Sequence, residues 1–178
     1  MSRPLNRQIS LKPQDLIVLL KLAVRGKPFT YAALGEELFM SSSEVHGSVG
    51  RAKLAGVLSE TDDYGIQVLR PALREFTLHG ARYAFPPILG SLARGIPTAH
   101  GAPLLRDQFT SSEEPVPVWP YSKGNVRGIA IQPLFPTVPK AVETDDRLYE
   151  LLALFDSIRM GTARERAIAS TLVTRILS

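Results

Sequence analysis

The chain has 178 residues, and its 44% apolar and 21% charged residues can form a buried core, which excludes a protein that is disordered throughout. A formal net charge of +4 permits an acidic partner such as nucleic acid but is too small for a polybasic protein. The absence of cysteine excludes disulfides, thiolate zinc sites and cysteine nucleophiles.

The first ten residues are polar and basic, and we expect a flexible arm there. Residues 16–24 form the best candidate for a membrane segment, but this stretch has only nine residues and contains Lys21. A spanning helix needs about 20 apolar residues, and no small-residue cleavage site follows this stretch. We therefore expect a cytoplasmic protein with no membrane segment.

Two helices are predicted before residue 40. Ser10 can cap the first, Pro13 suits its first turn, and Gly26 can close it in the left-handed conformation. Thr30 can cap the second. Both have apolar residues at helical spacing, namely Leu16, Leu19, Leu20 and Ala23 in the first and Tyr31, Leu34 and Leu38 in the second.

A third helix is predicted to begin after Ser41. Glu44 follows three residues later, and this spacing is that of a capping box. Val45, Val49 and Ala52 form its apolar stripe. Two short strands, at residues 57–60 and 66–69, then flank a polar hairpin loop. Three helices followed by a hairpin are the order of a winged helix-turn-helix, which lays one helix in the major groove of DNA.

The remaining residues predict mixed structure. A helix is expected at residues 70–79, with Gly80 as its end. Residues 85–139 hold 10 of the 14 prolines, so strands and turns are expected there, with strands at 116–119 and 126–132. Two final helices are expected to pair, one capped by Thr144 and one opened by a capping box of Thr162 and Glu165.

The fold class predicted is therefore α+β. It comprises an N-terminal winged helix-turn-helix, a Pro-rich segment with short strands and a C-terminal antiparallel helix pair. The expected organisation is a flexible arm at residues 1–10, a winged helix-turn-helix domain at 11–80, and a Pro-rich α+β region with a C-terminal helical hairpin at 81–178.

The third helix supplies the candidate DNA-binding residues. Its side opposite the apolar stripe is polar or bare, as a recognition helix requires. Arg51 is suited to guanine or phosphate, and interior glycines allow close backbone approach, although packing of another helix of the protein is the alternative explanation for them. The candidates are Ser42, Ser43, His46, Gly47, Arg51 and Lys53.

Residues 11–69 resemble the winged helix-turn-helix regulators, most closely those of the MarR-like style. The resemblance is carried by Thr30 to Leu38 for the support helix, Ser41 to Val45 for the start of the recognition helix, and Arg51 to Leu58 for the approach to the wing. It implies a transcriptional regulator that binds double-stranded DNA as a homodimer.

A protein-interaction module is the alternative, for instance an antitoxin-like partner of a neighbouring protein. The recognition helix holds only one Arg and one Lys, and Asp62 and Asp63 at the wing tip would be repelled by phosphate. Such a module would contact its partner protein through the Pro-rich region. The two functions can coexist in one protein.

No catalytic motif is recognisable, so we expect neither an enzyme nor a cofactor or metal. The three histidines are far apart in sequence and show no ligand spacing. His100, within the Gly- and Pro-containing residues 94–103, is a candidate for a ligand-sensing or catalytic group. The other interpretation of this stretch is a turn-rich surface loop.

Overall fold

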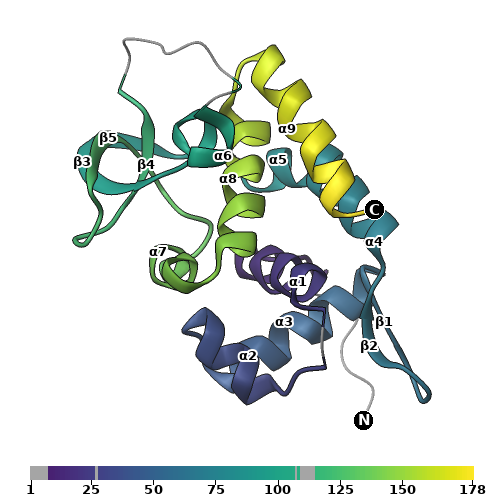
Figure 1. The fold of residues 1–178 in the computed structure, drawn as a ribbon. Coiled ribbons are helices and arrows are strands. Elements are labelled where there is room, and N and C mark those ends of the chain that lie inside the picture. The colour runs from purple at the N-terminus through teal and green to yellow at the C-terminus, as the bar shows by residue number, and fades with distance from the viewer. Residues whose placement is uncertain (1–7, 27, 107, 109–114) are drawn as a thin grey trace.

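The computed structural model describes residues 8–26, 28–106, 108 and 115–178, and its fold is α+β (Figure 1). Most of the arm expected at residues 1–10 lies outside the described residues. The amino-terminal elements are α1 (Pro13–Arg25), α2 (Tyr31–Leu38), α3 (Ser42–Leu54), β1 (Leu58–Thr61) and β2 (Gly65–Val68). A helical run follows, made of α4 (Arg70–Glu75), the π-helical turn η1 (Phe76–Gly80) and α5 (Ala81–Ala84).

The carboxy-terminal elements begin with a long strand and end with two long helices. They are β3 (Leu89–Pro97), η2 (Ala99–Gly101), α6 (Pro103–Arg106), β4 (Pro117–Pro120), β5 (Val126–Ile131), α7 (Val138–Ala141), η3 (Val142–Thr144), α8 (Asp146–Met160) and α9 (Ala163–Ile176). None of the helices in the described ranges is long and apolar enough to cross a membrane.

The boundaries of α1 follow from local chemistry, with one correction to the expected cap. Lys12, and not Ser10, precedes the helix, because Pro13 at the first helical position disfavours a helical conformation of the residue before it. The Lys12 N–H donates to the Asp15 carboxylate at 2.8 Å. Gly26 ends the helix with φ 67°, as expected.

The caps of α2 and α3 are confirmed. Thr30 Oγ1 accepts from the Ala33 N–H at 3.1 Å. Ser41 and Glu44 form the expected reciprocal pair, with the Ser41 N–H donating to Glu44 Oε2 at 2.8 Å. Gly35 within α2 lets the turn after this helix pack closely against it, since a Cβ there would lie 2.6 Å from the Met40 carbonyl oxygen.

The hairpin and the helical run after it differ slightly from expectation. β1 and β2 pair antiparallel about one residue away from the expected boundaries. The helical run does not stop at Gly80 but continues to Ala84. A Cβ at position 80 would lie 2.8 Å from the Phe76 ring, so this glycine lets the π turn close on that ring.

Three strands form a small closed barrel, at the upper left of Figure 1. β3 pairs antiparallel with both β4 and β5, and β4 and β5 pair parallel with each other. The positions of β4 and β5 agree with the prediction to about one residue, whereas β3 is not predicted. Gly128 permits the close packing of these strands, because a Cβ there would lie 2.0 Å from the Val116 carbonyl oxygen.

Helix α8 is the centre of the molecule and lies between the barrel and α9, with α1 below it (Figure 1). One hydrophobic core runs from α1 through α8 to α9, so the regions 11–80 and 81–178 share it. Asp145, and not Thr144, caps α8, its carboxylate accepting from the Leu148 N–H at 3.0 Å. The expected capping box of Thr162 and Glu165 opens α9.

A buried carboxylate joins the barrel to α8. Asp156 is 1% exposed and accepts hydrogen bonds from Thr98 Oγ1 at 2.8 Å, from Trp119 Nε1 at 2.7 Å and from Arg159 Nε at 2.7 Å. The same guanidinium donates to the carbonyl oxygens of Phe85 and Gln132. These contacts satisfy a charge pair that is otherwise expensive to bury.

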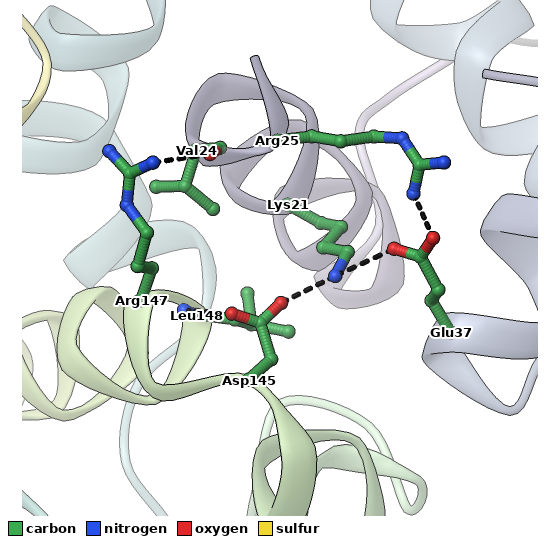
Figure 2. A network of polar contacts seen from close by, with 7 residues as sticks. All are labelled: Lys21, Val24, Arg25, Glu37, Asp145, Arg147 and Leu148. Atoms are coloured by element: carbon green, nitrogen blue, oxygen red, sulfur yellow. Dashed lines mark hydrogen bonds and ion pairs between the residues drawn. The ribbon is translucent and has the colours of Figure 1, made fainter. Parts of the chain in front are cut away.

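A second polar network joins α1 to α2 and to the start of α8 (Figure 2). Lys21 Nζ lies 2.8 Å from Glu37 Oε2 and also contacts Asp145, and Arg25 contacts the other oxygen of Glu37. Burial raises the pKa of Glu37, but the hydrogen bonds from Lys21 and Arg25 outweigh it, so that the pKa lies below 4.5.

Glu37 is therefore expected to make stability depend on pH. A carboxylate with a depressed pKa in the folded state stabilises the protein above its unfolded pKa, and this contribution disappears as the pH falls through the folded pKa. Replacing Glu37 with Gln should remove about 1 kcal/mol at pH 7 and flatten the loss of stability below about pH 4.5.

Urea denaturation at several pH values between about pH 3 and pH 7 measures this effect. The control is Glu36→Gln on the same helix, because Glu36 is exposed. Equal acid sensitivity of the wild type and the Glu37→Gln variant would contradict the prediction.

Candidate nucleic-acid interface

The third helix packs into the core through its apolar side. Val45, Val49 and Ala52 are at most 1% exposed and pack into the core, as expected. The helix contacts α1 and α2, while β1 follows directly after it. Its amino end is fixed by the Ser41 and Glu44 capping box.

The opposite side of α3 faces open space. Ser42, Ser43 and His46 are exposed. Among residues 8–26, 28–106, 108 and 115–178, a Cβ added at Gly50 meets no atom within 4 Å, and one added at Gly47 meets only Arg51 Nη1, at 3.3 Å. Packing against the segments that the structure describes therefore does not account for Gly50, and the outward face is free of those segments.

His46 is positioned by an aromatic contact. Its ring meets Tyr31 of α2 edge to face, with 5.0 Å between the ring centroids, and Tyr31 meets Phe29 in the same manner at 5.9 Å. Because the His46 side chain is still exposed, this contact orients it without covering it.

The Arg51 side chain is paired with a carboxylate of α1. Its Nε and Nη2 donate to the two carboxylate oxygens of Asp15 at 2.8 and 2.6 Å, and Nη2 also reaches Ser48 Oγ. The Asp15 side chain is fully buried, and these hydrogen bonds raise the pKa of Arg51. This bidentate pair with a buried carboxylate holds α3 against α1, and a contact of Arg51 with DNA stays a prediction.

Lys53 is also engaged within the chain. It forms an exposed ion pair with Glu60 of β1, and the hydrogen bond to Glu60 raises the pKa of Lys53. Asp62 and Asp63 are exposed at the tip of the hairpin. The candidate residues Ser42, Ser43, His46 and Gly47 thus share one open face, while Arg51 and Lys53 flank it with their charges paired.

His100 is remote from this face in the structure. It lies in η2, where Nδ1 is 3.3 Å from Glu165 Oε1 at the start of α9. Within the described ranges no group of three or more His, Asp or Glu side chains is placed to hold a metal ion. The contacts of His100 are those of a half-buried residue that joins η2 to α9.

Asp15 is the residue near α3 that sequence reasoning misses. A signal is present, because Asp15 shares a helix face with Leu19 and Ala23, four and eight residues later. A carboxylate on an apolar face needs a buried cationic partner. Which cation pairs with Asp15 depends on a contact between residues 36 positions apart in the chain, and helix periodicity does not reveal such a contact.

Comparisons with known proteins add no assignment. No protein-family model matches the chain, and no match is found among curated proteins or among solved structures.

Proposed function

We propose that this protein is a transcriptional regulator that binds double-stranded DNA sequence-selectively. In this proposal α1, α2, α3 and the β1–β2 hairpin are a winged helix-turn-helix, with α3 as the recognition helix. Two copies act together on a pseudo-palindromic site, as the similarity of residues 11–69 to MarR-like regulators implies.

The observation that carries the proposal is the open, glycine-containing face of α3. A glycine inside a helix costs roughly 1 kcal/mol relative to alanine, and among the described residues Gly50 has no neighbour that demands it. Close approach of the helix backbone to base edges is a reason for a bare surface at this position. Ser42 and Ser43, at the amino end of the helix, are suited to phosphate, and His46 to base edges.

The test uses two substitutions at Gly50. Gly50→Ala should stabilise the fold by about 1 kcal/mol, because the added methyl group meets open space. Gly50→Glu should leave the fold intact but weaken DNA binding about tenfold or more, since it places a bulky anion against phosphate and base edges. Duplexes selected by the wild type from a random library provide the probe, and gel retardation at several salt concentrations measures binding.

The matched control adds the same charge elsewhere. Ala167 is exposed on α9, so Ala167→Glu should fold and bind the selected duplexes like the wild type. The proposal fails if the wild type retains no duplex in a salt-dependent manner. It also fails if Gly50→Glu binds as tightly as Ala167→Glu.

Protein binding is the second candidate function, and the charges around α3 favour it. Arg51 and Lys53 are paired with Asp15 and Glu60, and the hairpin tip carries two carboxylates. Phosphate contacts dominate the affinity of DNA-binding proteins, so this pairing reduces the attraction that α3 can offer. In this second function the protein is an antitoxin-like partner of a neighbouring protein, and it contacts that protein through the Pro-rich region.

A further inference from the structure

The outer surface of the barrel carries two arginines that face each other. Arg94 of β3 and Arg127 of β5 are directly opposite in the antiparallel register, so their side chains lie on the same face of the sheet. Both are exposed, and no carboxylate of the described residues forms a salt bridge with either. Like charges directly opposite each other destabilise a sheet, so this arrangement calls for a ligand that neutralises it.

Apolar side chains adjoin the arginine pair. Leu92, opposite Ile129, lies on the same face and is 49% exposed, and the nearby Ile88 and Leu89 are 59% and 58% exposed. A hollow of about 470 Å³ borders these last two residues and is otherwise lined largely by prolines, Leu134 and Ala130. The barrel surface therefore combines two cations with an apolar area that has room for a side chain.

We propose that the surface formed by Arg94, Arg127, Leu92, Leu89 and Ile88 binds a partner protein through a segment rich in acidic and apolar residues. A carboxylate between the two guanidinium groups would accept charge-assisted hydrogen bonds from both. Apolar side chains of the partner would cover Leu92 and enter the hollow beside Leu89. Arginine is enriched at protein interfaces, whose centres are apolar.

Two other occupants fit this surface less well. A second copy of the chain in a two-fold interface would bring four arginines together without a counter-charge. Nucleic acid would neutralise the arginines but would leave the three exposed aliphatic side chains uncovered. The surface is also remote from α3, which lies at the bottom of Figure 1 while β3 and β5 lie at its upper left. The inference does not depend on DNA binding; it deepens the second candidate function, protein binding through the Pro-rich region, by naming the surface and the chemistry of the partner segment.

The experiment is a selection from a random peptide library displayed on phage, with the full-length protein immobilised. Three proteins are compared, namely the wild type, the double variant Arg94→Glu, Arg127→Glu, and the double variant Arg164→Glu, Arg175→Glu. The last is the matched control, because both of its arginines are exposed on α9 and the change in net charge is the same. The melting temperature of each protein verifies that it folds. The single variant Arg94→Glu, which creates an opposite-charge pair with Arg127, is tested in addition to the three proteins.

The wild type and the α9 control should enrich peptides that combine Asp or Glu with apolar residues. Replacing Arg94 and Arg127 with Glu should weaken the binding of these peptides about tenfold. The double variant should enrich peptides with Lys or Arg instead. Retention of the selected DNA should be unchanged by this reversal, so that failure here and failure of the DNA proposal are distinguishable.

The proposal is overturned if no peptide is enriched, if the enriched peptides lack acidic residues, or if they bind the reversed variant equally well. Competition by duplex DNA for the peptide site would assign the surface to nucleic acid instead. Sedimentation that shows a wild-type dimer dissociated by the reversal would assign it to a second copy of the chain.

Discussion

Replacing Asp156 with asparagine is expected to lower the free energy of unfolding by about 3–5 kcal/mol, a large part of the stability of a domain of this size. The Arg159 side chain is 3% exposed and would keep its charge without a carboxylate partner. Thr98 and Trp119 could still donate to the amide oxygen, so the decrease in the free energy of unfolding measures the loss of the Asp156–Arg159 charge pair. Urea denaturation followed by circular dichroism measures it.

Asp146→Asn is the control for this prediction. Asp146 lies on the same helix but is exposed in its first turn, where a carboxylate contributes at most about 1 kcal/mol through the helix dipole. Similar midpoints for the Asp156→Asn variant and the wild type would show that the buried pair does not hold the barrel on α8.

Replacing Arg51 with alanine should also destabilise the fold, by about 3–5 kcal/mol. The substitution leaves the fully buried carboxylate of Asp15 without its bidentate partner. Lysine at position 51 should recover little, because it cannot form the two parallel hydrogen bonds of a guanidinium group. Replacing both partners, Asp15→Leu with Arg51→Met, should recover most of the loss, because no buried charge then remains.

Lys53→Ala gives the matched comparison on the same helix. Its ion pair with Glu60 is exposed, and such pairs contribute about 0–1 kcal/mol. Denaturation curves of the three single variants and the double variant test the assignment. If the Arg51→Ala variant is as stable as Lys53→Ala, Arg51 does not hold α3 against α1 and its side chain is available to bind DNA.

This assignment changes how DNA-binding data on Arg51 variants are interpreted. A loss of binding in Arg51→Ala would follow from displacement of α3 as readily as from loss of a base contact. The Gly50 variants avoid this ambiguity, because a side chain at that position meets open space. They are therefore the more direct test of whether the outward face of α3 enters the major groove.

Local signals in the sequence determined much of the fold. The caps at Thr30, Ser41 and Thr162 and the closing Gly26 all depend on residues within about four positions of each other, so they are visible without a structure. The apolar stripe of α3 is likewise local, because helix periodicity alone places it on one face. These elements and the open face of α3 could be predicted from the sequence.

The tertiary structure alone decided what the charged side chains do. Arg51 pairs with Asp15 across 36 positions of the chain, and Asp156 receives Thr98 and Trp119 from segments distant in sequence. Strand β3 was missed for a related reason, since its pairing with β4 and β5 depends on segments distant in sequence. Helix ends are set by near neighbours, whereas ion pairs and strand partners are set by whichever distant segments the core brings together.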